Sequence, residues 1–168
     1  GVNDLPTIDQ LSQLTIDEEK TTFLKLNALD PEQNIISYKA FSQINEIDTE
    51  IKSDTLVMTP KENYSGESII TVSAHDNISV SGDTTTFKLI VNNINDAPVI
   101  AEIEDDNVDE DSMEKSVMLS ASDVDSKDLI FFVSNDTNEV NAFITGNKLT
   151  YKPIADFFGN TVLQVSVS

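Results

Sequence analysis

The sequence contains no cysteine, which excludes disulfides, thiolate catalysis and cysteine-based zinc sites. All ten cationic residues are lysine, so the bidentate guanidinium clamp on phosphate or carboxylate groups is absent. The single histidine and the lack of a glycine-rich phosphate loop or a G-x-S-x-G motif argue against an enzyme. No apolar run approaches the roughly 20 residues that a membrane-spanning helix needs.

Acidic residues dominate the charge. The 168 residues include 30 Asp and Glu against 10 Lys, a formal net charge of −20. This excess argues against nucleic acid as a partner and against anionic membrane surfaces, because both attract clustered cations. The apolar fraction of 39% is enough for a packed core, and the length allows one large domain or two ordinary ones. Because the chain starts at Gly1 without a signal peptide, we expect a piece of a longer protein.

The sequence repeats itself at a spacing of 92 to 93 residues. Asn-Asp-Leu-Pro-Thr-Ile at residues 3–8 returns as Asn-Asp-Ala-Pro-Val-Ile at residues 95–100. Further blocks return in the same order, with one inserted residue: 16–18 as 108–110, 28–32 as 121–125, Pro60 as Pro153, Tyr64 as Phe157, Gly66 as Gly159 and 69–73 as 162–166. So many matches in one order are not a chance event, so the sequence predicts two tandem domains, residues 1–94 and 95–168.

Each repeat reads as a series of β-strands. Thr22, Leu24, Leu26 and Ala28 alternate with polar residues, and so do Phe87, Leu89 and Val91. Short strands at 8–12-residue spacing predict an immunoglobulin-like sandwich of about seven strands. The match of residues 162–168 to 69–75, with nothing to match 76–94, predicts that the second repeat lacks its final strand. The repeat register also predicts core positions for four aromatic residues: Tyr38, Tyr64, Phe132 and Phe157.

Acidic residues gather at turns that recur in both repeats. Asp17-Glu18-Glu19 corresponds to Asp109-Glu110-Asp111, and Asp30 with Glu32 corresponds to Asp123 with Asp125. Close carboxylates repel, and a divalent cation removes that cost. Ca²⁺ takes about six to eight oxygen ligands from carboxylates, amides and backbone carbonyls. The sequence offers these hard ligands and no thiolates, so Ca²⁺ is the predicted cofactor.

The order of these motifs resembles cadherin repeats, especially the bacterial cadherin-like tandem repeats of large surface and secreted proteins. The family pattern runs V-x-E, A-x-D-x-D, A-x-D and a linker D-x-N-D-N-x-P. The matching segments are residues 16–18, 28–32, 74–76 and 92–98. The linker departs from the pattern in reading Asn-Asp-Ala-Pro, with Asn92 in place of the first Asp. The resemblance implies an all-β fold of two immunoglobulin- or cadherin-like Greek-key sandwiches.

The resemblance also implies calcium ligands at the junctions between repeats. For the junction inside this chain it implies the residues Glu18, Glu62, Asn93, Asn95, Asp96, Asp123 and Asp125. For a preceding repeat it implies Asn3, Asp4, Asp30, Glu32 and Asp76, and for a following repeat Glu110. The counterpart of Asp76 in repeat two would follow Ser168, so we expect the internal site to lack one ligand and to hold one or two ions.

Three functions are compatible with this interpretation. The first is a Ca²⁺-rigidified spacer in an extracellular or surface protein, whose partners are neighbouring repeats and possible cell-surface glycans or proteins. The second is a carbohydrate-binding module, although sugar platforms favour exposed Trp and Tyr, and the sequence has no Trp and three Tyr. The third is adhesion by the repeats themselves, which needs an exposed apolar patch. The acidic turns are also compatible with plain solvated loops, and Asp30 and Asp123 with residues that cap their own turns.

Overall fold

A computed structural model of the chain describes residues 3–78 and 81–168. These residues form sixteen β-strands and no helix. The chain divides into two compact units, Gly1–Ile94 and Asn95–Ser168, which are described separately below. The predicted all-β fold class is confirmed.

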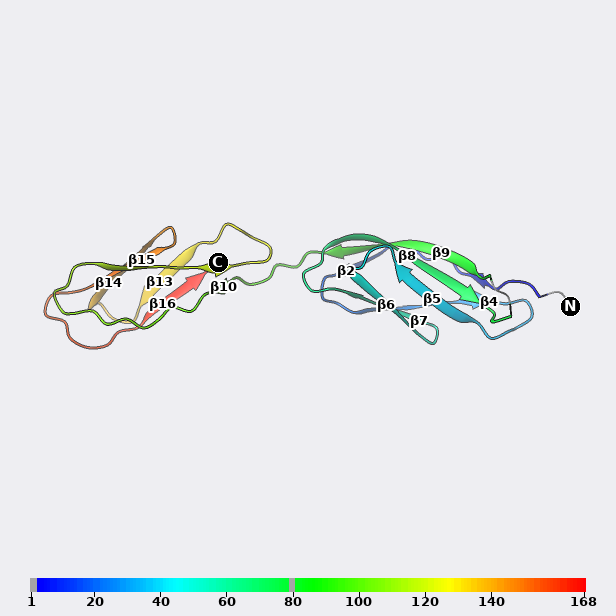
Figure 1. The fold of residues 1–168 in the computed structure, drawn as a ribbon, viewed down its shortest axis with the longest axis horizontal. Helices are drawn as coiled ribbons and strands as arrows, with labels where there is room; N and C mark the ends of the chain where they lie inside the picture. Colours follow the sequence, from blue (N-terminus) through cyan, green and yellow to red (C-terminus); the bar gives the residue numbers. More distant parts are fainter. Residues whose placement is uncertain (1–2, 79–80) are drawn as a thin grey trace. The chain divides into compact units, whose positions relative to one another are not determined.

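Unit 1 is a sandwich of two sheets (Figure 1). Its strands are β1 (Thr7–Ile8), β2 (Leu14–Asp17), β3 (Thr22–Lys25), β4 (Ala28–Leu29), β5 (Ser37–Ser42), β6 (Ile47–Lys52), β7 (Thr55–Pro60), β8 (Gly66–His75) and β9 (Asp83–Asn92). One sheet has the order β2-β9-β8-β5 and the other the order β3-β7-β6, while β1 pairs with β4. All pairs are antiparallel except β2 with β9.

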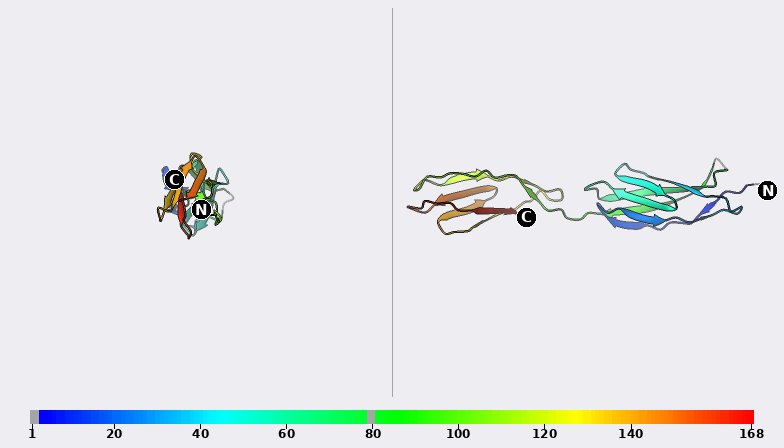
Figure 2. Two further views of the ribbon diagram at one scale, coloured as in Figure 1. Left: turned by 90° about the vertical axis from the view of Figure 1, so that its left-hand side faces the viewer. Right: turned by 90° about the horizontal axis from the view of Figure 1, so that it is seen from below.

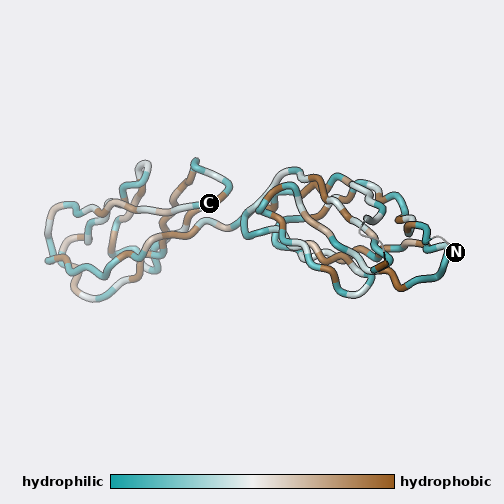
Figure 3. The backbone as a smooth tube through the Cα atoms, turned by 45° about the vertical axis from the view of Figure 1, so that its right-hand side comes forward, coloured by the Kyte–Doolittle hydropathy of each residue, from teal (hydrophilic) through white to brown (hydrophobic). Residues whose placement is uncertain are grey.

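The core of unit 1 follows from strand alternation. On β8 the side chains of Ile70, Val72 and Ala74 are fully buried, and on β9 those of Phe87 and Leu89 are buried beside them. Buried leucine, isoleucine and methionine residues of the facing sheet complete one continuous cluster. Figure 3 shows the resulting alternation of apolar and polar residues along the chain. Period-two patterning therefore places one face of each sheet inside, as the sequence predicts.

Unit 2 repeats the strand pairings of unit 1 that do not involve β9. Its strands are β10 (Val99–Ile100), β11 (Lys115–Met118), β12 (Ala121–Ser122), β13 (Phe131–Asn135), β14 (Val140–Thr145), β15 (Lys148–Pro153) and β16 (Leu163–Val167). The register is conserved at an offset of 93: Ile47 pairs with Pro60 on β6 and β7, and Val140 pairs with Pro153 on β14 and β15. Strands run roughly along the length of each unit (Figure 2).

Unit 2 lacks the counterpart of β9. The strand β16 corresponds to β8 but pairs only with β13, in a two-stranded sheet. Two further segments of unit 2 are not strands, because the segments of unit 1 that correspond to them pair with β9. These are residues 106–109, which correspond to β2, and residues 159–162, which correspond to the start of β8. The prediction that repeat two lacks its final strand is confirmed.

One expected core residue is wrong. Phe132 on β13 is 50% exposed, whereas its neighbour Phe131 is the true counterpart of Tyr38. The pairings Tyr38 with Ala74 and Phe131 with Val167 share the offset of 93. Phe132 is one residue out of register with Tyr38, and a shift of one residue along a strand turns the side chain to the opposite face. Tyr38 and Tyr64 do pack against the core of unit 1, and Phe157 is partly buried.

Candidate metal centre

The loops at the β1 and β4 end of unit 1 bring oxygen-bearing side chains together. We call Asn3, Asp4, Asp30, Glu32, Asn34 and Asp76 the first-unit loop cluster. The Nδ2 group of Asn3 donates to Asp76 Oδ2 at 2.6 Å, and the Nδ2 group of Asn34 donates to Asn3 Oδ1 at 3.1 Å. The backbone N–H of Asp4 donates to Glu32 Oε2 at 3.1 Å. The five ligands that the sequence predicts for this end therefore lie in one hydrogen-bonded network.

Asp30 organises the loop within this cluster. Its Oδ1 accepts hydrogen bonds of 2.9 Å from the backbone N–H groups of Glu32 and Asn34. The loop can fold back this way because Gln33 adopts the left-handed conformation, with φ of 61°. The second oxygen, Asp30 Oδ2, is buried and has no hydrogen-bond partner within residues 3–78 and 81–168. Asp30 therefore caps its own turn with one oxygen and leaves the other available to a cation.

Asp76 is the most deeply buried carboxylate of the cluster, with 2% of its surface exposed. It directly follows β8, and its Oδ1 accepts a hydrogen bond of 2.9 Å from the backbone N–H of Ile78. Asp76 thus has both carboxylate oxygens in hydrogen bonds, with the Oδ2 accepting from Asn3 and the Oδ1 from Ile78. Ion pairs in the described parts of the chain include Lys25–Asp54, Lys52–Glu50, Lys88–Glu67 and Lys115–Asp106.

Unit 2 builds a similar loop from the repeated motif. The second-unit loop cluster consists of Asn95, Asp96, Asp123 and Asp125. Asp123 Oδ1 accepts 2.7 Å hydrogen bonds from the backbone N–H groups of Asp125 and Ser126, the second and third residues after it, whereas the donors to Asp30 are the second and fourth. Asp125 Oδ2 accepts a hydrogen bond of 2.6 Å from the Asp96 N–H, which repeats the bond between Glu32 and Asp4. The repeated sequence therefore produces a repeated local geometry.

Glu18 directly follows β2, and 5% of its surface is exposed. Its Oε1 accepts a 2.5 Å hydrogen bond from the Ile94 N–H, and its own N–H donates to Asn92 O at 3.0 Å. Nearby in sequence, Asn93 Oδ1 accepts from Ser65 Oγ at 3.3 Å. The segment after β9 therefore covers Glu18. Its counterpart Glu110 is exposed, and Glu62 is exposed in the turn after β7.

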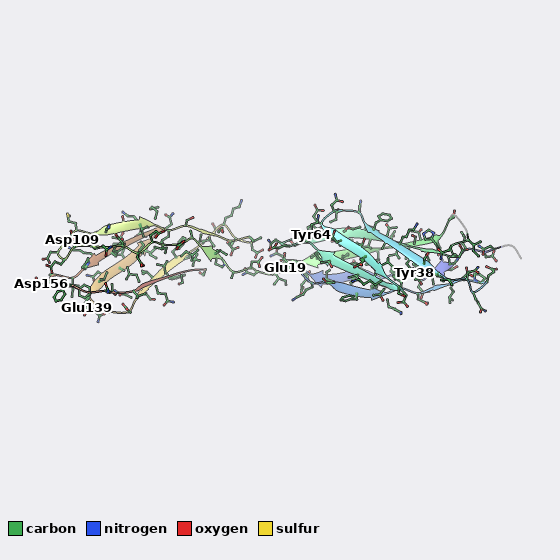
Figure 4. The ribbon with its side chains drawn as sticks, turned by 60° about the horizontal axis from the view of Figure 1, so that its bottom comes forward. Glu19, Tyr38, Tyr64, Asp109, Glu139 and Asp156 are labelled. Atoms are coloured by element: carbon green, nitrogen blue, oxygen red, sulfur yellow. The ribbon has the colours of Figure 1, made fainter. Side chains whose placement is uncertain are left out.

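Acidic side chains also gather at one end of unit 2, where Figure 4 labels Asp109, Glu139 and Asp156. Asp111 Oδ1 accepts a 3.3 Å hydrogen bond from the Asp156 N–H in this region. Hydrogen bonds from Lys115 and Tyr151 lower the pKa of Asp106, and a hydrogen bond from Lys25 lowers the pKa of Asp54.

The chemistry of the donors fits a hard cation. Within residues 3–78 and 81–168, no three His, Cys, Asp or Glu side chains alone converge as a metal site. The first-unit loop cluster reaches a larger oxygen count by adding the amides of Asn3 and Asn34 to its carboxylates. Amide, carboxylate and backbone oxygens are the ligand set of Ca²⁺. The sequence motif did not identify Asn34, because its position depends on the turn at Gln33.

Comparison with known proteins supplies the family. The model of a family described as bacterial Ig domain matches residues 3–92 and again residues 95–168. The chain belongs to the bacterial Ig domain family. It consists of two consecutive Ig domains of this family, which accords with the repeat in the sequence and the repeated strand register. A search of curated proteins finds no match.

Several solved structures are similar to this bacterial Ig tandem, and the first of them shares its fold. Drosophila N-cadherin EC1-4 is 14% identical, with a TM-score of 0.54 over 98% of this chain and 48% of its own. Human protocadherin-24 EC1-2 is 15% identical, with a TM-score of 0.46 over 98% of this chain and 94% of its own. An endo-fucoidan hydrolase of glycoside hydrolase family 107 is 18% identical, with a TM-score of 0.46 over 98% of this chain and 26% of its own. The Ig tandem thus spans less than half the length of two of these neighbours.

Family membership favours a role as an extracellular repeat or spacer, and Ig domains are typically non-catalytic. The part of the chain that the structure describes has no helix long and apolar enough to cross a membrane.

Proposed function

We propose that this bacterial Ig tandem is a Ca²⁺-rigidified spacer segment of a larger extracellular protein, with neighbouring repeats as its immediate partners. In this role the loop clusters bind Ca²⁺, and the two sandwiches add length to the larger protein. The calcium part of the proposal is supported by the local geometry of each unit, and the spacer part by the family and the tandem architecture.

The observation that carries the proposal is the buried, unpartnered Oδ2 of Asp30. A buried carboxylate oxygen without a donor costs free energy, unless a cation compensates for its charge. Asp76 is buried in the same hydrogen-bonded network through Asn3. A Ca²⁺ ion bound at Asp30 Oδ2, with Asp76 and the amides of this cluster as further oxygen ligands, would give that Asp30 oxygen a partner.

The charge of each unit adds to the argument. Residues 1–94 hold 15 acidic residues and 6 lysines, a net charge of −9, and residues 95–168 hold 15 and 4, a net charge of −11. A compact unit with this charge is destabilised by self-repulsion. Divalent cations bound at the loop clusters would reduce part of that repulsion.

The rigidifying role is supported by the resemblance to cadherin-like repeats, which implies candidate ligands in both units. Glu18 and Asn93 belong to unit 1, whereas the second-unit loop cluster belongs to unit 2. An ion that took ligands from both units would fix their relative orientation, and its removal would restore freedom at the linker. The role we propose for Ca²⁺ is therefore mechanical rather than catalytic.

Calcium titration by calorimetry, paired with thermal melting in chelator and in millimolar Ca²⁺, tests the proposal. We expect a melting temperature that rises with Ca²⁺, because an ion that binds only the native state stabilises it by mass action. Asp30→Asn should weaken Ca²⁺ binding at least about tenfold, a loss of about 1.4 kcal/mol. The matched control is Asp48→Asn, an exposed aspartate on β6.

The spacer role has its own readout. X-ray scattering of the chain should show a narrower distribution of conformations in Ca²⁺ than in chelator. Equal melting temperatures in chelator and Ca²⁺ would overturn the calcium site. Normal Ca²⁺ binding with unchanged scattering would instead leave calcium as a stabiliser of single domains and overturn rigidification.

A further inference from the structure

The sheet β11-β15-β14 of unit 2 carries a groove on its outer face, with a volume of about 380 Å³. Leu149 on β15 is buried in the core, so its neighbours Lys148 and Thr150 face outward. Ser116 on β11 and Phe143 on β14 each pair with Thr150, one from either side. These four residues line the groove together with Glu114 and Thr145. Thr150 therefore lies in the groove between a small hydroxyl side chain and an aromatic ring.

The side chain of Thr150 has an unusual environment for a polar group. Only 7% of its surface is exposed, although it is on the outer face of the sheet. Its hydroxyl forms no hydrogen bond with any residue of 3–78 or 81–168. A buried hydroxyl without a partner costs free energy, unless a ligand or water in the groove provides one. Thr150 thus directs an available hydrogen-bonding group into the groove.

Unit 1 has the same three strands in the same register, but not this arrangement of side chains. At the offset of 93, the counterparts of Ser116, Phe143 and Thr150 are Phe23, Glu50 and Val57. Val57 is 6% exposed and pairs with Phe23, so an apolar pair lies where unit 2 has two hydroxyls. The Ig fold therefore does not require the hydroxyls, and the groove is a property of unit 2.

The charged groups of the groove favour an uncharged ligand. Glu114 and Lys148 form no ion pair or side-chain hydrogen bond within the described parts of the chain. A third charged residue at the groove, Lys115, is already paired with Asp106. One carboxylate and one ammonium group remain, and they offer an acceptor and donors side by side. An anionic ligand would meet Glu114 and the acidic excess of unit 2.

Phe143 provides the apolar part of the groove. Its side chain is 49% exposed, so part of the ring is available to a ligand. The face of an aromatic ring carries partial negative charge and attracts the weakly positive C–H groups of a sugar ring. A ligand that packs on Phe143 and also reaches Thr150 needs a C–H face and hydroxyl groups on one small ring. The volume of the groove is at the lower end for small-ligand sites.

We propose that this groove binds an uncharged hexose residue of a glycan. Phe143 packs against the C–H face of the sugar ring, and Thr150 forms a hydrogen bond with one of its hydroxyls. Lys148 donates to other hydroxyls of the sugar, and Glu114 accepts from them. Glycan binding of this kind goes beyond the spacer role. It is independent of calcium, because no residue of the groove belongs to either loop cluster.

An NMR titration of the intact chain with cellohexaose, laminarihexaose and mannohexaose tests the proposal. At least one of these uncharged oligosaccharides should shift the amide signals of Ser116, Phe143 and Thr150. We expect a dissociation constant of about 1 mM or lower for this contact with one sugar ring. The signals of the corresponding strands β3, β6 and β7 should stay unchanged. The result should be the same in chelator and in Ca²⁺.

Two variants test the residues of the groove. Phe143→Ala should weaken binding at least about tenfold, because it removes the surface on which the sugar packs. The matched control is Phe132→Ala, since Phe132 is 50% exposed but lies on β13 in the other sheet. Thr150→Val should weaken binding about fivefold through the loss of one hydrogen bond. Its melting temperature should not fall, because Val57 occupies the corresponding position in unit 1.

Three outcomes would overturn the proposal. The first is that none of the three oligosaccharides, in millimolar excess, shifts the signals of the groove. The second is an equal loss of binding in Phe143→Ala and Phe132→Ala, which would place the ligand elsewhere. The third is binding of an alginate hexamer without binding of the uncharged sugars, which would identify a carboxylated ligand.

Discussion

At the scale of single residues, Gly66 and Gly159 show why an aromatic residue precedes a glycine in both repeats. Gly66 has φ of +144° and Gly159 has φ of +154°, values that side-chain-bearing residues rarely adopt. A Cβ placed on Gly66 would lie 2.9 Å from Tyr64 Oη, and one on Gly159 would lie 3.3 Å from Phe157 Cζ. The aromatic ring thus covers the glycine in each unit.

We therefore expect Gly66→Ala to destabilise unit 1 by about 2 kcal/mol. Gly146→Ala is the matched control, because Gly146 also has a positive φ, +63°, but a Cβ there meets no atom within 4 Å. Gly146→Ala should lower the stability of unit 2 by about 1 kcal/mol. Chemical denaturation of the three chains measures the difference. Equal losses for the two variants would show that contact with Tyr64 is irrelevant.

Tyr151 predicts an alkaline pH dependence. Burial and the hydrogen bond to Asp106 raise its pKa from 10.0 to about 12. A folded-state pKa above the unfolded value contributes stability that is present below pH 10 and is lost as the pH rises toward 12. We expect ultraviolet titration to show one phenolate that ionises late, and Tyr151→Phe to remove that step. A late step that persists in the variant would assign it to Tyr38 or Tyr64, whose pKa values burial also raises.

At the scale of elements, β13 provides a direct test of strand register. Phe131 faces the core and pairs with Val167, whereas Phe132 is on the opposite face. We expect Phe131→Ala to cost about 2 kcal/mol, less than a fully buried phenylalanine because it is partly exposed. Phe132→Ala should stay within about 0.5 kcal/mol. Thermal melting of both variants checks this, and the reverse order would indicate that β13 is shifted by one residue.

The sequence predicted elements well wherever the pattern is local. The alternation of Phe87, Leu89 and Val91 identifies a buried strand face, and the repeat identifies the two units. The error at Phe132 arose because adjacent aromatic residues leave a period-two pattern ambiguous by one. The loss of strand structure at residues 106–109 is not visible in that segment, because a β-strand exists only with its partner.

In the candidate site too, sequence motifs identify some residues, whereas others depend on how the chain folds. Asn3, Asp4, Asp30, Glu32 and Asp76 were grouped from motifs far apart in the chain, and the network in unit 1 brings them together. Asn34 was missed because its approach depends on the left-handed turn at Gln33, which no motif encodes. The burial of Glu18 against the exposure of Glu110 also depends on the segment after β9, not on the shared acidic triplet.

At the scale of the whole molecule, the net charge of −20 predicts two different responses to ions. Monovalent salt screens repulsion among all carboxylates, with a Debye length of about 10 Å at 0.1 M, and this response needs no site. Bound Ca²⁺ acts only through its ligands. A melting experiment on the intact chain and on Asp30→Asn separates the two effects.

In chelator, NaCl should raise the melting temperature of both chains gradually and by similar amounts, because one carboxylate among 30 acidic residues hardly changes the total charge. Ca²⁺ should produce a response that saturates in the intact chain, and a smaller one in Asp30→Asn, at an ionic strength where NaCl has little effect. Asp30→Asn is the variant chosen because Asp30 Oδ2 is buried and has no hydrogen-bond donor in the described part of the chain. If NaCl at matched ionic strength reproduces the whole calcium response, the acidic loops act only as a diffuse charge and not as a site.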